Sequence, residues 1–503
     1  MSVVESVLAV FGVLTIAYFA ILSLLHAAFA FVGLQTVILE SRLTSDTELR
    51  DLLERDVFKP VSIIVPAFNE EATIVAAVQS FIRLHYPKFE VIVIADGSTD
   101  GTMDRLIEAF ALVEEPRVWA RTLPTMPVIR VMRSLRHPGL VVAEKENGGK
   151  PDAVNAGINL ARYPLIAPVD SDCLLDAQAI LRASRSFVKD DAVIAVGGTV
   201  RPLNGATIRG GQPAELRMPP RWVERLQIVE YARAFFLGRA GWTRMGALLI
   251  ISGAFGLFRR DAVLKVGGFW TGTLGEDMEL VMRLHKEYTR AGLPHRIIFS
   301  PDPICWTEVP SDIATLRRQR SRWHRGLWTN LWRHKDMLLN PRYGRLGLFA
   351  VPYFWLFEGL APAIEVLGFV SFGLAAALGL LDTGLLWLFL ALAILHGMVL
   401  SQVAAGVEAM LLHRYSSRSD RLILFAASLV EFLGFHQLIA FERFRSTFHS
   451  RKKRGEWGEM RRAGIPAAET PKASSGAPRN VDDVPVAVVR EPDARRSSIP
   501  IEG

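Results

Sequence analysis

Long apolar regions stand near both ends of the chain and enclose a middle stretch in which apolar runs are short. The first region, Ser6 to Leu39, contains no Asp, Glu, Lys or Arg, and it is long enough to span a bilayer with some tilt. A cleaved signal peptide is the alternative, but this run is too long for a signal core and no basic region precedes it. We therefore expect residues 1–40 to form a transmembrane anchor.

Apolar character returns in three segments, 346–381, 383–407 and 422–441. The basic segments 413–421 and 443–462 should both face the cytosol by the positive-inside rule. Three full crossings after a cytosolic domain would place the second basic segment outside. Either one apolar segment is interfacial or re-entrant, or 346–381, which contains Pro352 and Pro362, turns back within the membrane.

From residue 60 onward, short β-rich runs alternate with stretches of helical periodicity. The pattern predicts strands at 61–66, 90–95, 140–143 and 165–169, and helices at 71–84 and 151–161. Such alternation is typical of an α/β fold with a mostly parallel sheet covered by helices. Ligands of these sheets bind beyond the carboxyl ends of the strands, and Asp96 and Asp170 both stand at such ends.

Composition supports a membrane protein with a soluble domain. The 503 residues are 50% hydrophobic, with a mean hydropathy of +0.24 and a net charge of +7. The cations cluster beside apolar segments, which favours anionic lipid and phosphorylated substrates over nucleic acid. Two cysteines are too few for a disulfide framework or a zinc site. Beyond the anchor we expect a connector at 41–58, a soluble domain at 59–330, an interfacial segment at 331–345, transmembrane or interfacial helices at 346–447, and a basic, then disordered tail at 448–503.

Two acidic motifs follow predicted strands. Asp96 and Gly97 form a simple turn, or the Asp96 carboxylate accepts a hydrogen bond from a base or ribose. Asp170 and Asp172 can present oxygens to one hard cation, Mg²⁺ or Mn²⁺, which would stabilise charge on a departing diphosphate. A solvated loop is the alternative for this pair, but its place after an apolar strand favours a metal site.

Two later motifs lie on predicted helices. Glu276 and Asp277 open a helical run after Gly275, where acids are ordinary caps; the functional interpretation makes one carboxylate a general base. Residues 319–323 lie among several arginines, which suit phosphate, and Trp323 offers a flat face to a sugar ring. An interfacial helix is the alternative, and both hold if the site lies close to the bilayer.

The ordered set of motifs resembles family 2 glycosyltransferases of the membrane synthase type, which include cellulose, hyaluronan, chitin-oligosaccharide and poly-N-acetylglucosamine synthases. The similarity extends over about residues 59–441. One departure is Ala95, where the family often has a second acid. The motifs that carry the resemblance are Val65-Pro66-Ala67-Phe68-Asn69-Glu70, the strand end at Asp96, Gly149-Lys150-Pro151-Asp152-Ala153, Asp170 with Asp172, Gly275-Glu276-Asp277, and Gln319 with Arg322 and Trp323.

The resemblance implies an inverting transferase of the A-type fold, with Rossmann-like architecture and a mostly parallel sheet. Asp277 would deprotonate the acceptor hydroxyl, and Asp172 would hold the divalent cation with Asp170 nearby. The remaining implied contacts fall into two groups. Glu70, Asp96, Lys150 and Asp170 would bind the nucleotide sugar, and Glu276, Gln319, Arg322 and Trp323 would bind the acceptor end and the diphosphate.

The main hypothesis is a processive enzyme that moves a sugar from a nucleotide sugar, expected to be a UDP-sugar, to a growing polysaccharide at the plasma membrane. Its soluble domain would be cytosolic, its partners would be membrane lipid and accessory export subunits, and it would bind no nucleic acid. Glu358 and Glu365 share a helical face and would flank a product exit route. Transfer of one sugar to a lipid acceptor is the alternative, and a non-catalytic sugar-nucleotide sensor is a third.

Overall fold

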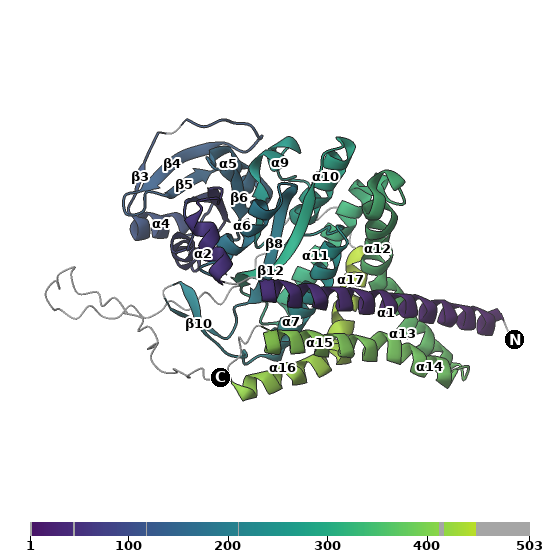
Figure 1. The fold of residues 1–503 in the computed structure, drawn as a ribbon. Coiled ribbons are helices and arrows are strands. Elements are labelled where there is room, and N and C mark those ends of the chain that lie inside the picture. Colours follow the sequence, from purple (N-terminus) through teal and green to yellow (C-terminus); the bar gives the residue numbers. More distant parts are fainter. Residues whose placement is uncertain (1–2, 44–45, 117, 210, 412–416, 449–503) are drawn as a thin grey trace, which may run out of the picture. The chain divides into compact units, whose positions relative to one another are not determined.

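The computed structural model describes residues 3–43, 46–116, 118–209, 211–411 and 417–448. The predicted disordered tail lies outside these residues. Within them, a ten-stranded mixed sheet is joined to a set of apolar helices that includes the N-terminal helix α1 (Val3–Leu43), as Figure 1 shows.

Four parallel strands form one half of the sheet, in the order β5 (Leu140–Lys145), β2 (Phe89–Asp96), β1 (Val61–Ala67) and β6 (Leu165–Pro168). These strands are almost completely buried, which explains their near-continuous apolar sequence. Since β2 and β6 flank β1, their carboxyl ends open at the same edge of the sheet. The α/β fold expected from the alternating pattern is thus confirmed.

Strands on both sides of this parallel group complete the sheet, and most of their pairings are antiparallel. Strands β4 (Val128–Ser134) and β3 (Leu112–Glu114) follow β5 at one side. Beyond β6 the order continues with β11 (Gly256–Arg259), β8 (Val193–Pro202), β12 (Arg296–Thr307) and β7 (Cys173–Leu175). Within this half, β8 and β12 are parallel, whereas β11 is antiparallel to both of its neighbours. A separate ribbon is made by β9 (Ala206–Arg209) and β10 (Gln212–Leu216).

Further helices connect these strands or flank the sheet along the chain. They are α2 (Asp46–Glu54), α3 (Ile74–Ile82), α4 (Thr102–Phe110), α5 (Lys150–Leu160), α6 (Ala179–Lys189), α7 (Trp222–Ala232) with its π-helical continuation η1 (Arg233–Arg239), α8 (Ala240–Arg244), α9 (Arg260–Lys265), α10 (Glu276–Arg290), α11 (Ile313–Arg333), η2 (Lys335–Met337) and η3 (Pro341–Tyr343). The helix expected at 71–84 begins only at Ile74, because Glu70 to Thr73 form a turn closed by Thr73 N–H to the carbonyl oxygen of Glu70 at 3.0 Å. The polar connector contains helix α2, which the sequence pattern did not predict.

Among the residues that the structure describes, three helical stretches are long and apolar enough to cross a membrane: 4–39, 383–409 and 418–447. A fourth candidate is the pair 346–359 and 361–377, which is bent by 41° at its break. That bend falls in the proline-containing segment for which the sequence allowed a turn within the membrane. The elements are η4 (Leu346–Ala350), α12 (Val351–Tyr353), η5 (Phe354–Gly359), α13 (Ala361–Ala377), α14 (Thr383–Leu390), η6 (Ala391–Leu395), α15 (His396–Leu411), α16 (Arg418–Val430), η7 (Glu431–Phe435) and α17 (His436–Thr447).

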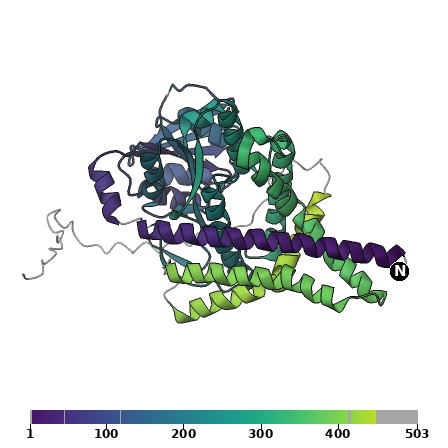
Figure 2. The same cartoon turned by 45° about the vertical axis from the view of Figure 1, so that its right-hand side comes forward.

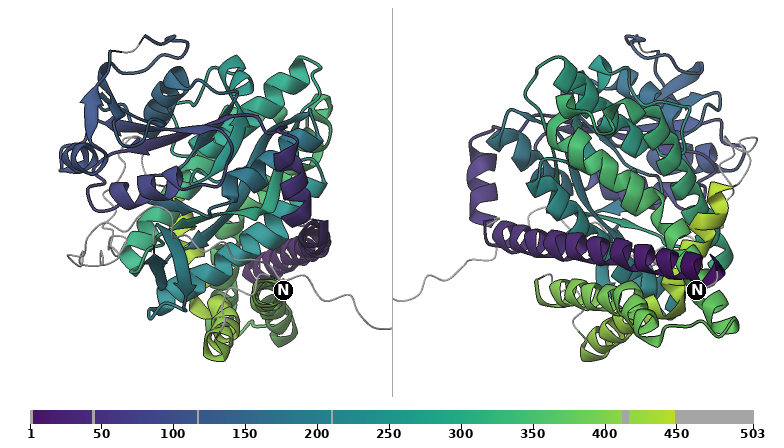
Figure 3. Two further views of the ribbon diagram at one scale, coloured as in Figure 1. Left: turned by 60° about the vertical axis from the view of Figure 1, so that its left-hand side comes forward. Right: turned by 90° about the vertical axis from the view of Figure 1, so that its right-hand side faces the viewer.

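The apolar helices pack on one another and on the soluble domain. Helix α1 lies against α13, α14 and α15, and Figure 2 and Figure 3 show it, in purple, beside the green helices. Helix α7 packs on α15 and α16, whereas α11 packs on α17. The sheet domain is therefore attached to the apolar helices through α7, its continuation η1, α8 and α11.

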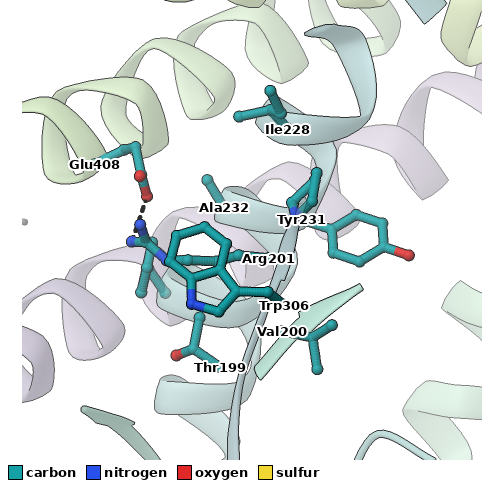
Figure 4. Close-up of a pocket in the computed structure, with 10 residues that line it drawn as sticks. Thr199, Val200, Arg201, Ile228, Tyr231, Ala232, Trp306 and Glu408 are labelled. Carbon is teal, nitrogen blue, oxygen red and sulfur yellow. Dashed lines mark hydrogen bonds and ion pairs between the residues drawn. The ribbon is translucent and has the colours of Figure 1, made fainter. Parts of the chain in front are cut away.

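A buried ion pair reinforces this attachment. Arg201, at the end of β8, is 2.8 Å from a carboxylate oxygen of Glu408 on α15, and both side chains are buried. Figure 4 shows the Glu408 carboxylate beside the Arg201 guanidinium. Both residues line a cavity of about 20 Å³, together with Trp306 and Tyr231. The Arg201 guanidinium lies 5.7 Å from the ring centroid of Trp306. Ion pairs of this kind are strongly destabilising to break, because the surviving charge stays buried.

Candidate functional site

Asp96 is the last residue of β2, and its carboxylate organises the loop that follows β5. It accepts hydrogen bonds from the backbone amides of Gly148 at 3.1 Å and Gly149 at 2.7 Å, and it forms an ion pair with Lys145. Gly149 has φ +85°, a conformation that side chains rarely adopt. Asp96 therefore shapes the glycine turn that leads into α5.

Lys145 is the buried partner of this loop, and the sequence analysis did not identify it. Its amino group also lies 2.6 Å from a carboxylate oxygen of Asp152 on α5. Asp96 is only 2% exposed, and the amides of Gly148 and Gly149 bond its two carboxylate oxygens. Its expected contact with a nucleoside stays a prediction. The arrangement makes the loop itself, rather than the carboxylate, the more accessible surface.

Asp170 and Asp172 lie just beyond β6 and close to each other. Their carboxylate oxygens and the Cys173 sulfur lie within 4.8 Å of one another. Burial raises the pKa of Asp170, the positive charge of Lys150 opposes that shift, and the negative charge of Asp172 adds to it. Two crowded carboxylates are the donor set that Mg²⁺ or Mn²⁺ prefers. The residues present thus fit a divalent cation.

Lys150 connects this acidic pair to the second acidic motif. Its amino group lies 2.7 Å from Asp170 and 3.1 Å from Glu276, and its side chain is 16% exposed. Lys150 is therefore not a solvated surface lysine. Burial acts to lower the pKa of Lys150, but the nearby carboxylates outweigh burial and raise it.

Asp277 lies in the first turn of α10. One of its oxygens accepts from the backbone amide of Gly253 at 3.0 Å, and the other accepts from the amide of Met278 at 2.8 Å. Burial, followed by repulsion from Glu276, raises the pKa of Asp277 to about 6 although Lys150 opposes the change. A carboxylate with such a pKa is suited to accept a proton near neutral pH.

Gly253 holds the space between these groups. A Cβ at this position would lie 3.1 Å from Lys150 Nζ, 3.3 Å from Glu276 Oε1 and 3.5 Å from Asp277 Oδ2. The carbonyl oxygen of Gly253 also accepts from Lys150 at 3.1 Å.

Helix α11 brings the arginine- and tryptophan-containing motif to the start of α10. A Cβ on Gly326 would lie 3.0 Å from the nitrogen of Gly275, so the two backbones are in close contact. Asn330 secures the contact by donating to the carbonyl oxygen of Gly275 at 2.7 Å and accepting from the hydroxyl of Thr273 at 2.9 Å. Asn330 gave no signal in the sequence, because its role depends on this tertiary contact.

The remaining predicted residues occupy different settings. Trp323 is 44% exposed, and Arg322 is half-buried. The Gln319 side-chain oxygen accepts from Arg320 at 2.7 Å. Glu70 is buried, and its carboxylate accepts from the hydroxyl of Thr73 at 2.6 Å in the turn before α3. That hydrogen bond gives Glu70 a local structural role, and its contact with a nucleotide sugar stays a prediction.

The family described as "Glycosyltransferase like family 2" matches residues 59–326. The chain belongs to glycosyltransferase family 2. The matched range contains the whole sheet and all of the acidic motifs, and it ends within α11 just after Trp323. The family resemblance inferred from the motifs is therefore confirmed, as is the A-type glycosyltransferase fold.

Poly-beta-1,6-N-acetyl-D-glucosamine synthases are among the similar proteins. This family 2 glycosyltransferase is 28% identical to the synthase of Staphylococcus aureus (strain COL) over 54% of this chain and 55% of the relative. It is 28% identical to the Staphylococcus epidermidis synthase over 54% and 56%. The chain thus spans about half the length of the curated relatives it matches. A solved mannosyltransferase from Pyrobaculum calidifontis, in complex with GDP-Man and Mn²⁺, is 19% identical, with 82% and 99% coverage and a TM-score of 0.45.

Proposed function

We propose that this protein is an inverting, metal-dependent glycosyltransferase that extends a polysaccharide at the membrane. The donor would be a UDP-sugar with N-acetylglucosamine as the sugar, as the names of the synthase relatives suggest. The observation that carries the proposal is the convergence of Asp170, Glu276 and Asp277 around Lys150 and Gly253. It supports a metal–diphosphate site directly beside a candidate base.

In this proposal Asp277 removes the proton from the acceptor hydroxyl. That oxygen attacks the anomeric carbon from the side opposite the nucleotide, the bond from that carbon to the diphosphate breaks, and the diphosphate leaves with the bonding electrons. The amide of Gly253 fixes the orientation of the carboxylate. Burial raises the pKa of Asp277, Glu276 raises it further and Lys150 lowers it, so these three effects together set the pH range in which the base is ready.

Asp172 and Asp170 would hold the divalent cation. When bound, such a cation neutralises charge on the departing diphosphate. Lys150 adds a fixed positive charge next to Asp170. The glycine loop held by Asp96 is proposed to lie along the nucleotide, since glycines let a ligand approach the backbone closely.

The exposed ring of Trp323 is proposed to stack on the acceptor sugar, and Gln319 and Arg322 to bind near the diphosphate. Helix α11 places this platform beside α10 and also packs on the apolar helix α17. A growing chain would then leave towards the bilayer. Glu358 and Glu365, paired with Arg443 at 3.3 Å and His436 at 3.3 Å, are proposed to line this route.

The test is turnover by the purified full chain with Mg²⁺ or Mn²⁺ and a panel of nucleotide sugars. We expect nucleoside diphosphate release to be highest with UDP-N-acetylglucosamine and to yield a ladder of products. One labelled lipid product would instead support transfer of a single sugar. If the folded protein releases nucleoside diphosphate from none of the nucleotide sugars, the proposal is contradicted.

A further inference from the structure

Arg320 lies within the acceptor motif but faces away from solvent. It is 3% exposed and forms an ion pair with Glu230 on α7 at 2.6 Å. It also donates to the side-chain oxygen of Gln319 at 2.7 Å. Its guanidinium carbon lies 4.2 Å from the centroid of the Trp323 ring. One buried cation thus contacts two side chains of the motif and is itself held by a carboxylate from another helix.

The helix that supplies this carboxylate is firmly held. Gln227, one turn before Glu230, donates to the carbonyl oxygen of Pro310 at 2.8 Å, which ties α7 to the segment leading into α11. Leu226 and Val229 belong to an apolar cluster with Leu424 of α16. Helix α7 therefore connects the apolar helices to the acceptor motif, although the sequence analysis assigned no role to this helix.

We propose that Glu230 is a positioning residue that, through Arg320, fixes Trp323 and Gln319 for binding of the acceptor sugar. This inference rests on the proposed function and names the residue that holds the proposed acceptor site in position. Glu230 touches neither donor nor acceptor. It sets the orientation of Arg320, and Arg320 in turn supports the tryptophan ring.

The physical reason is the cost of a buried charge without a partner. If Glu230 loses its charge, Arg320 remains a desolvated cation and gains by turning towards water or another acid. That movement removes the cation beside the Trp323 ring and the donor to Gln319. Stacking of a sugar depends on the ring orientation, and a displacement of about 1 Å can cost as much as about 100-fold in rate. The donor site, built around Lys150 and Asp170, does not include this ion pair.

The experiment compares Glu230→Gln, Glu230→Asp and Arg320→Gln with wild type in the full chain. The acceptor is a soluble β-linked N-acetylglucosamine oligosaccharide, and the donor is UDP-N-acetylglucosamine. The matched control is Glu442→Gln, since Glu442 pairs with Arg317 of the same helix at 2.8 Å. Each variant is measured for transfer against acceptor concentration, for donor hydrolysis without acceptor, and for thermal unfolding.

For Glu230→Gln we expect kcat/KM for the acceptor to fall about 10- to 100-fold, while donor hydrolysis without acceptor changes less than twofold. Glu230→Asp should recover part of the loss, and Glu442→Gln should not show the selective effect on the acceptor. An unchanged acceptor dependence in a folded Glu230→Gln protein overturns the inference. So does an equal loss of transfer and hydrolysis. If wild type turns over no nucleotide sugar, the proposed function fails first, which separates the two failures.

Discussion

The backbone of Gly253 contacts Asp277 and Lys150 at the same time: its amide donates to Asp277 Oδ2 at 3.0 Å, and its carbonyl oxygen accepts from Lys150 at 3.1 Å. One peptide segment thus sets the spacing between the candidate base and Lys150, whose amino group contacts Asp170 of the proposed metal site. A small change of shape at this glycine should affect catalysis more than folding.

Gly253→Ala is therefore expected to lower kcat by at least about tenfold. The added Cβ would lie only 3.1 Å from Lys150 Nζ and 3.3 Å from Glu276 Oε1, so both side chains must move. Gly139→Ala is the control, because its Cβ would meet its nearest neighbour, the carbonyl oxygen of Phe89, at an ordinary 3.6 Å. Initial rates at saturating donor and acceptor measure the effect. Equal rates for the two variants would show that the contact around Gly253 does not matter for turnover.

The fall of kcat/KM at acid pH, the acid limb of the pH profile, should reflect protonation of Asp277. Its pKa is raised to about 6, and the base works only when deprotonated, so kcat/KM should fall as the pH drops through about 6. Glu276 raises this pKa by repulsion. Glu276→Gln should therefore shift the acid limb to lower pH, as measured by kcat/KM between pH 4.5 and 8.

Lys150 acts on the same carboxylate with the opposite sign, because its positive charge lowers the pKa of Asp277. Lys150→Met should shift the limb to higher pH and also weaken donor binding. Opposite displacements in the two variants are the distinguishing result. If the acid limb of kcat/KM lies at the same pH in both variants as in wild type, a group other than Asp277 controls it.

Lys145 should contribute to the stability of the fold. It is fully buried and pairs with both Asp96 and Asp152, so Lys145→Met leaves two buried carboxylates without their cation. We expect the free energy of unfolding to fall by about 3–5 kcal/mol. Lys286→Met, which removes a pair with the exposed Asp336 at 2.9 Å, should cost less than about 1 kcal/mol. Similar thermal unfolding midpoints for the two variants would contradict this interpretation of the Lys145 cluster.

The sequence predicted much of the fold because burial leaves a clear local pattern. Runs such as 61–66 and 90–95 are apolar throughout, and both are buried parallel strands. The later strands β8, β11 and β12 were not predicted, because their sequences lack a long uninterrupted apolar run. Gly197 and Gly198 interrupt β8, β11 has only 4 residues, and Pro301 and Pro303 interrupt β12.

The residues of the candidate site also divide into those with a local sequence signal and those without one. Asp170, Asp172, Glu276 and Asp277 could be found because short acidic motifs follow strands or open helices. Lys145, Asn330 and Glu230 could not, because each acts on a residue 49 or more positions away. Asp96 was recognised as important, but its sequence setting did not indicate that its carboxylate would be occupied by a glycine loop.

The Arg201–Glu408 pair predicts how the two parts of the protein depend on each other. Arg201→Met leaves Glu408 as a buried acid and should cost about 3–5 kcal/mol of stability. The double variant Arg201→Met with Glu408→Met should be more stable than the single variant, because no buried charge remains. Thermal unfolding in one detergent measures both. A double variant that is less stable than Arg201→Met would mean that the pair itself, rather than the unpaired acid, dominates.

The central claim is that Asp277 accepts the proton of the attacking hydroxyl, and Asp277→Asn tests it most directly. Asparagine keeps one side-chain oxygen, which can accept from the amide of Gly253, but it loses the acceptor for the amide of Met278. The protein should therefore keep its fold, with a thermal unfolding midpoint a little below that of wild type. With UDP-N-acetylglucosamine, a divalent cation and acceptor, we predict nucleoside diphosphate release about 100- to 10,000-fold slower than wild type. Release at the wild-type rate by the folded variant would contradict the account.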